Sequence, residues 1–237
     1  MICYLRSIGE RTEKIAYDIL KEEMPVVLVK NMSLSDSTRF ICEEALKSGQ
    51  EWTLFADADI IPEKGYATRF HEIAKNSPPE VMAVKGWIKD KFLMEQRGLN
   101  GGSFLYRTDL LQTWLDVFDL VDNQRTTEPQ CYKVLKKQGY RFEQTDIFVG
   151  LHDYEQHYHD IFRSCFVYGK KKKSAKKLMR RWEKLSKDDK DFEVCLYAYQ
   201  KGREYTGQVK ADFRIDYGFK ESPFKDWMKD GLERIHT

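Results

Sequence analysis

An apolar run that ends in two carboxylates constrains this chain more than any other feature. The run is Trp52-Thr-Leu-Phe-Ala-Asp57-Ala-Asp59-Ile-Ile61, and Pro62 and Gly65 follow it. Its apolar residues predict a strand buried in a sheet, and the Pro and Gly predict a loop behind it. Alternate residues of a strand point to the same side. We therefore expect the two carboxylates to converge on one cation or polar ligand.

Strand and helix patterns alternate ahead of this run. Apolar residues at 2–5 and 25–29 predict buried strands. Helical spacing follows each of them, at 15–20 and at 38–47, with a loop expected at 33–37 and an end at Gly49. The order β-α-β-α-β predicts an α/β fold with a mixed, mainly parallel sheet flanked by helices.

The second half continues this alternation and then changes character. We expect a helix before Pro78, strands at 81–84, 104–106 and 140–150, a tight turn at 99–103, and helices starting at 108 and near 127. Residues 151–160 are polar and rich in histidine, and the remainder is basic with a helical pattern. We therefore expect a catalytic domain at 1–165 and a basic, mainly helical C-terminal extension at 166–237.

Composition narrows the class of protein. A chain of 237 residues can bury one good core. A net charge of only +2 argues against a generic binder of polyanions. The five cysteines include no CxxC pair, which indicates neither a disulfide framework nor a zinc knuckle and favours a reducing compartment. The first apolar run is too short for a signal peptide, and we expect a cytoplasmic protein.

Asp57 and Asp59 suit a hard divalent cation. Mg²⁺ and Mn²⁺ are bound by carboxylate and phosphate oxygens, and such a cation can neutralise a diphosphate leaving group. The alternative is a plain turn, because Asp often ends strands.

In Phe55-Ala-Asp57-Ala-Asp59 the chain resembles the GT-A fold glycosyltransferases, nearest to the family 2 group, over about residues 1–165. The resemblance implies a nucleotide-diphospho-sugar transferase with Mn²⁺ or Mg²⁺ as cofactor. It implies transfer from a nucleotide-sugar, preferably a UDP-sugar, to a hydroxyl of a glycan or lipid-linked glycan, with inversion favoured.

The same resemblance implies roles for individual residues. Asp57 would contact the ribose or the metal, and Asp59 would bind the cation. The nucleotide would lie over Arg6, Ser7 and Asn31, where the family usually has Pro and Thr after the first strand and an acidic residue after the second. These departures leave the nucleotide open.

Further candidates lie downstream. Gly101, Gly102 and Ser103 are expected to line the donor-sugar and acceptor pocket, or to form a plain turn. Glu128 is the expected catalytic base, with a helix-dipole role as the alternative and Asp153 as the next candidate for the base. His152 is the expected further metal ligand.

Two other histidines and a basic segment complete the candidates. His157 and His159 do not match common zinc spacing. Between Lys170 and Lys184 there are nine Lys or Arg and one acid. The helix expected at 170–185 either packs its apolar face on a core or lies on an anionic membrane. Nucleic-acid binding is not expected, because no recognised motif is present.

Two rival functions remain open at this point. A strand followed by DxD also opens the haloacid dehalogenase phosphohydrolases, in which the first Asp is the nucleophile. The other rival is a non-catalytic module that binds a membrane or a polyanion through the basic helix.

Overall fold

The protein is described here by a computed structural model that covers residues 1–93, 102–121, 127–171 and 175–207. The contacts divide it into two compact units, each described by itself. Unit 1 is 1–89 with 95–152, and unit 2 is 90–94 with 153–237. This division falls earlier in the chain than the boundary at residue 165 expected from composition, because the helix at 158–171 packs with the helices that follow it.

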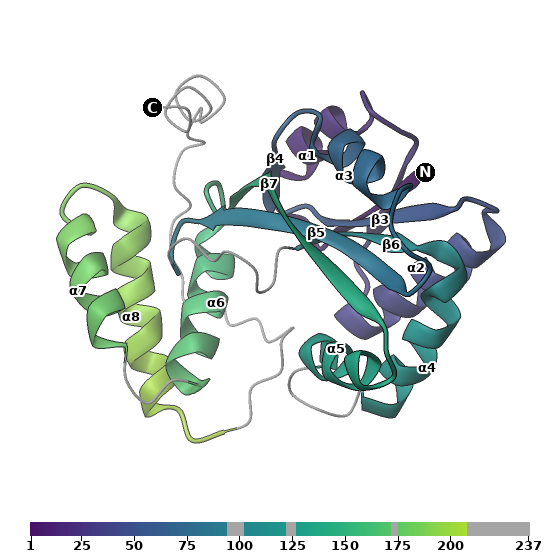
Figure 1. Ribbon diagram of the computed structural model, residues 1–237. Coiled ribbons are helices and arrows are strands. Elements are labelled where there is room, and N and C mark those ends of the chain that lie inside the picture. The colour runs from purple at the N-terminus through teal and green to yellow at the C-terminus, as the bar shows by residue number, and fades with distance from the viewer. Residues whose placement is uncertain (94–101, 122–126, 172–174, 208–237) are drawn as a thin grey trace. The chain divides into compact units, whose positions relative to one another are not determined.

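A sheet of seven strands, counted over the described residues, forms the centre of unit 1, in the order β2-β1-β3-β6-β5-β7-β4 (Figure 1). The strands are β1 (Ile2–Ser7), β2 (Val26–Lys30), β3 (Trp52–Asp57), β4 (Ile60–Pro62), β5 (Val81–Asp90), β6 (Ser103–Arg107) and β7 (Arg141–His152). Strand β1 is parallel to both β2 and β3. The pairs β3–β6, β5–β6 and β4–β7 are antiparallel. The α/β fold with a mixed sheet flanked by helices is therefore confirmed.

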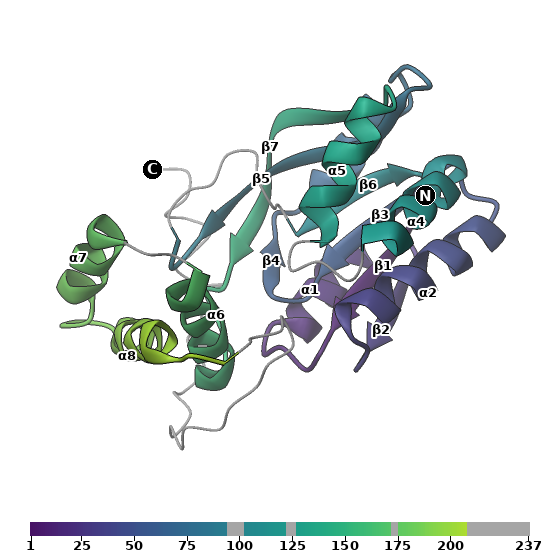
Figure 2. The same cartoon turned by 90° about the horizontal axis from the view of Figure 1, so that it is seen from below.

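Helices cover both faces of this sheet. They are α1 (Glu13–Leu20), α2 (Leu34–Lys47), α3 (Tyr66–Ala74), α4 (Leu111–Val121), which follows the 3₁₀ turn η1 (Thr108–Leu110), and α5 (Thr127–Lys137). On one face, α1 and α3 pack on Leu5 and Leu54. On the other, α2, α4 and α5 pack on Tyr4 and Phe55, and Figure 2 shows α2 and α4 side by side. Adjacent strand residues thus serve opposite cores, which explains why the strands read as continuous apolar runs.

Four elements differ from expectation. Strand β5 continues to Asp90 instead of ending at residue 84. Helix α2 begins at Leu34, because Ser33 is its N-cap and accepts a hydrogen bond from the Asp36 N–H; the loop expected at 33–37 is therefore wrong. Strand β4 was not expected as a separate strand. Strand β7 continues to His152 instead of ending at a Gly150 turn. Gly150 serves a close strand approach, since an added Cβ would lie 2.2 Å from the Ile61 carbonyl oxygen.

Unit 2 is helical and has its own core. Its helices are α6 (Tyr158–Lys171), α7 (Lys176–Leu185) and α8 (Lys190–Glu204). Leu178 and Trp182 of α7 are buried in this core. The apolar face of α7 therefore packs inside unit 2, as the core-packed alternative for the basic segment predicted. Among the described residues, no helix has both the length and the apolar character needed to cross a bilayer.

A buried ion cluster joins the short segment at 90–93 to α8 within unit 2. Lys91 Nζ contacts Oδ2 of Asp191 and lies 3.0 Å from Oδ2 of Asp189, the N-cap of α8. Both Lys91 and Asp191 are 5% exposed or less. Next to it, the Trp182 Nε1–H donates to the Phe92 carbonyl at 2.9 Å. The segment is thus bound to α7 and α8 by charges and by the core together.

Candidate functional site

The first two strands and β3 bring most of the predicted site residues to one edge of the sheet. Arg6 and Asp57 are register partners at the carboxyl ends of β1 and β3. Ser7 pairs in register with the last residue of β2, and the Asn31 N–H donates to the Ser7 carbonyl at 3.0 Å. Because parallel strands end at the same edge, residues from three separate stretches of the sequence lie together there. The nucleotide-binding role expected for this edge stays a prediction.

The chain turns sharply between the two carboxylates of the motif. Strand β3 ends at Asp57, and Ala58 and Asp59 form a turn before β4. The Ala58 N–H donates to the Arg6 carbonyl at 2.9 Å, and the Thr12 hydroxyl donates to the Ala58 carbonyl. Because Asp59 is not in a strand, the rule that alternate residues share a side does not apply. The Asp59 charge still contributes to raising the pKa of Asp57, so convergence of the two carboxylates on one ligand stays a prediction.

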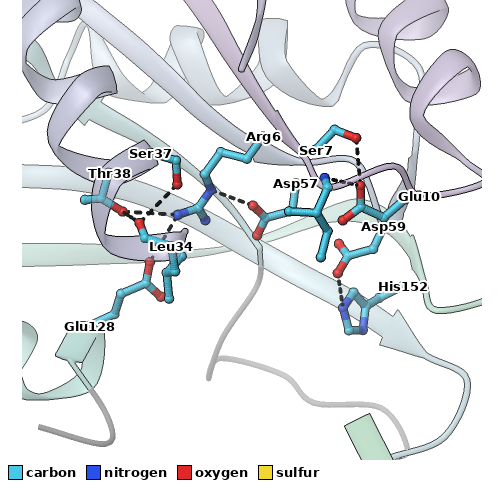
Figure 3. Close-up of polar contacts among 11 residues, drawn as sticks. Arg6, Ser7, Glu10, Leu34, Ser37, Thr38, Asp57, Asp59, Glu128 and His152 are labelled. Atoms are coloured by element: carbon cyan, nitrogen blue, oxygen red, sulfur yellow. Dashed lines mark hydrogen bonds and ion pairs between the residues drawn. The ribbon is translucent and has the colours of Figure 1, made fainter. Parts of the chain in front are cut away.

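Asp57 and Asp59 have different partners. Figure 3 shows the Asp57 side chain directed to Arg6 and the Asp59 side chain directed to His152. Arg6 Nε donates to Asp57 Oδ1 at 2.7 Å. Asp59 Oδ2 lies 3.3 Å from His152 Nε2. The motif therefore contributes one carboxylate to each of two neighbouring groups.

The first group is centred on Arg6. Its Nη1 lies 3.6 Å from Oε1 of Glu128, in the first turn of α5, and donates to the Thr38 hydroxyl of α2 at 3.4 Å (Figure 3). Burial alone would lower the pKa of the guanidinium, but the charges of Asp57 and Glu128 more than offset this and raise it. Arg6 therefore stays charged and links β1, β3, α2 and α5.

Asp57 has the perturbed acidity that such an environment produces. Burial raises its pKa from 3.8 to about 6, the Asp59 charge adds to this, and the Arg6 charge and hydrogen bond oppose it. The charge and the hydrogen bond of Arg6 offset part of the cost of burying this carboxylate. The ion pair is therefore what keeps Asp57 compatible with an ionised state inside the fold.

The second group has the donor chemistry of a cation site. One ligand atom each from Asp59, His152 and Asp153 lie within 4.8 Å of one another. Asp153 is placed by its peptide bond to His152, the last residue of β7, and has a positive φ of 61°. Two carboxylates and one imidazole fit Mn²⁺ better than Mg²⁺, because Mg²⁺ is held almost entirely by oxygen. The residues present thus fit the expected cation, with Asp153 in the place predicted for Asp57.

A third polar group lies in the turn after β1, and it was not predicted from the sequence. The Ser7 hydroxyl lies 2.8 Å from Glu10 Oε2 and 2.6 Å from Glu13 Oε2, and Lys30 Nζ lies 2.6 Å from Glu13 Oε1. Partial burial would raise the pKa of Glu13, but hydrogen bonds from Lys30 and Ser7 and the Lys30 charge lower it overall. Two acids in a polar turn directly after the first strand were the available sequence signal.

The predicted sugar pocket is described only in part. Gly101 lies outside the described residues. Gly102 has a φ of 48°, and an added Cβ would lie 2.6 Å from Ile60 Cδ1 and 3.2 Å from Asp57 Oδ2. Its carbonyl accepts from the Asp57 N–H at 3.0 Å. Gly102 therefore lies directly against the motif.

Ser103 and the remaining histidines have other surroundings. The Ser103 hydroxyl is 1% exposed and lies 2.8 Å from the Tyr66 hydroxyl, which differs from the pocket position expected for it. Among the described residues, neither His157 nor His159 belongs to a group of three metal-ligating side chains.

Comparison with known proteins gives distant structural likenesses. No family model matches the chain, and no curated protein matches it in sequence. A mannosyltransferase from Pyrobaculum calidifontis, solved with GDP-Man and Mn²⁺, is 11% identical at a TM-score of 0.46, covering 89% of this chain and 76% of that one. Glucosyl-3-phosphoglycerate synthase from Mycobacterium tuberculosis, solved with Mn²⁺ and UDP-glucose, is 9% identical at 0.40, covering 64% and 71%.

A further likeness is to 4-diphosphocytidyl-2C-methyl-D-erythritol synthase from Anaerococcus prevotii, 10% identical at a TM-score of 0.43, covering 65% of this chain and 89% of that one. At these identities and TM-scores, the likenesses assign neither a reaction nor a substrate to this chain.

Proposed function

We propose that this chain is a divalent-cation-dependent glycosyltransferase of GT-A type. It takes a sugar from a nucleotide-diphosphate donor, preferably a UDP-sugar, and passes it to a hydroxyl of a glycan or lipid-linked glycan. The observation that carries the proposal is the group of Asp59, His152 and Asp153 beside the carboxyl ends of β1, β2 and β3. A cation bound there would lie at the sheet edge where α/β folds bind phosphorylated ligands.

The roles of the cation residues follow from their chemistry. Asp59, His152 and Asp153 would hold Mn²⁺, with Mg²⁺ as the weaker alternative. When bound, the cation supplies positive charge that neutralises a diphosphate leaving group. Ser7 and Asn31, at the ends of β1 and β2, would line the nucleotide.

Glu128 is the proposed base for an inverting transfer. In such a transfer, the acceptor hydroxyl loses its proton to a carboxylate, its oxygen bonds to the anomeric carbon, and the bond from that carbon to the diphosphate breaks. Asp153 was the other candidate, but it groups with the cation ligands. Glu128 has a side chain that is 32% exposed and is ion-paired to Arg6 through Oε1. It therefore combines a fixed position with access to solvent.

The rivals receive less support from the geometry. A phosphohydrolase would use Asp57 as the nucleophile, yet Oδ1 of Asp57 accepts a hydrogen bond from Arg6 at 2.7 Å, which lowers its nucleophilicity. The membrane module would need the apolar face of α7, which packs inside unit 2. Membrane contact through residues 170–185 is therefore left out of the proposal.

A screen of nucleotide-sugars tests the proposal. We expect one of them to raise the melting temperature and to be hydrolysed slowly in the presence of Mn²⁺, and Asp59→Ala to abolish turnover while the circular dichroism spectrum is retained. Unchanged sugar transfer by the Asp59→Ala variant would refute the mechanism. Hydrolysis of a generic phosphomonoester that nucleotide-sugars do not affect would favour the phosphohydrolase instead.

A further inference from the structure

The two acids of the DxD motif belong to two different groups of side chains. Asp57 pairs with Arg6, and Asp59 lies near His152. Arg6 approaches Asp57 along the parallel pairing of β1 with β3, in which the two residues are direct partners. Its Nε is 2.7 Å from Asp57 Oδ1. The contact is fixed by the register of the sheet, because a shift of either strand would break the whole ladder.

The Arg6 side chain is held from several sides. It is 13% exposed, donates to the Thr38 hydroxyl, and lies 3.6 Å from Glu128 Oε1. Its guanidinium presents donors in a fixed planar fork, so one residue can hold two carboxylates at defined positions. A lysine has a single charged nitrogen and cannot reproduce this arrangement.

We propose that Arg6 is a positioning residue that keeps Asp57 out of the cation site and holds Glu128 in its position. The inference rests on the proposed function and deepens it. Asp57 acts through Arg6 to orient Glu128, whereas Asp59 and His152 hold the cation. The motif thus supplies one metal ligand, Asp59. Its other carboxylate, Asp57, holds Arg6 in place, and Arg6 in turn holds the proposed base Glu128.

Mn²⁺ binding without any nucleotide-sugar tests the inference. Free Mn²⁺ can be measured by electron paramagnetic resonance during titration of the protein. We expect Asp59→Asn to weaken Mn²⁺ binding by at least the roughly 10–100-fold typical of disturbed metal sites. The matched variant Asp57→Asn has the same change of charge two residues away, and we expect it to shift Mn²⁺ affinity by no more than a few-fold.

Variants of Arg6 provide a second, independent test by Mn²⁺ titration. In Arg6→Gln, Asp57 loses its partner, so we expect Mn²⁺ to bind more tightly and the added affinity to disappear in Arg6→Gln/Asp57→Asn. Loss of folding alone cannot tighten Mn²⁺ binding. We expect Arg6→Lys to leave kcat low, because it does not restore the two-carboxylate contact. If Arg6→Gln does not fold, the Mn²⁺ affinities of Asp57→Asn and Asp59→Asn still decide whether Asp57 is a metal ligand.

The outcomes separate the two claims. Loss of Mn²⁺ binding in folded Asp57→Asn as severe as in Asp59→Asn would overturn the role of Arg6 and leave the proposed function standing. Absence of Mn²⁺ binding by the unmodified protein would overturn both. Weakened Mn²⁺ binding in folded Arg6→Gln would also overturn the inference.

Discussion

Oδ2 of Asp59 lies 3.3 Å from Nε2 of His152, which connects the turn after β3 to the last residue of β7. The contact depends on the antiparallel pairing of β4 with β7, in which Ile60 is the partner of His152. A three-residue strand therefore determines whether the carboxylate and the imidazole meet.

The imidazole should set the choice of cation. In His152→Asp the donor set becomes all oxygen, so we expect the preference for Mn²⁺ over Mg²⁺ to fall. Isothermal titration with each ion measures the ratio of affinities. His71→Asp, on α3, is the control and should leave that ratio unchanged. An unchanged ratio in His152→Asp would remove His152 from the cation site.

Glu13 should contribute stability that depends on pH. Because its pKa is lower in the folded protein than the ordinary value of 4.5, its contribution is present above that value and is lost as the pH falls through the folded pKa. We expect Glu13→Gln to melt below the unmodified protein at pH 7 and the difference to shrink in acid. Melting temperatures between pH 7 and pH 3 measure this. Glu43→Gln, at an exposed position of α2, is the matched control. A difference that grows in acid would contradict the prediction.

Gly102 should tolerate no side chain. An Ala there meets both a left-handed backbone, which costs roughly 1–2 kcal/mol, and contacts with Ile60 and Asp57. Gly139 has a φ of 95° but no atom within 4 Å of an added Cβ, so Gly139→Ala isolates the backbone cost. We expect Gly102→Ala to lower the free energy of unfolding more than Gly139→Ala does, as measured in urea. Equal losses would show that the Ile60 and Asp57 contacts carry no cost.

Lys91 should be the most sensitive charge of unit 2. Removing one partner of a buried ion pair leaves uncompensated charge and typically costs about 3–5 kcal/mol. We expect Lys91→Met to reach that range and to speed hydrogen exchange in α8, whose first turn holds Asp191. Lys190→Met, at an exposed position, should have little effect. Recovery of part of the loss in Lys91→Met/Asp191→Leu would confirm that the unpaired carboxylate is the cause.

The first strands and the helical alternation could be predicted because burial on both sheet faces makes strands such as β1 and β3 largely apolar runs. The run from Trp52 to Ala56 shows this directly, since Leu54 and Phe55 pack in opposite cores. The same information located the carboxyl edge of the sheet, and the resemblance to GT-A enzymes then implied the candidate residues Arg6, Ser7 and Asn31 there. Sequence periodicity therefore predicts the layers and the edge of the sheet.

The partners within the site could not be predicted in the same way. Whether Asp59 faces Asp57 or His152 depends on a two-residue turn and on the register of β4 with β7, and neither leaves a periodic signal. The ion pair of Arg6 with Asp57 follows from the strand register, but its extension to Glu128 depends on where α5 docks. Local pattern carries no information on such docking, so the division of the motif became visible only in three dimensions.

The pairing of β4 with β7 also has a consequence for how the site is assembled. Strand β4 lies at one margin of the sheet, and its partner comes from residues 141–152, far later in the chain. Contacts of such sequence separation form slowly, since a long loop must close first. During synthesis, Asp59 emerges long before His152, so a nascent chain cannot hold the cation until β7 has been made and docked. A cation that binds only this completed arrangement would stabilise the margin that forms last.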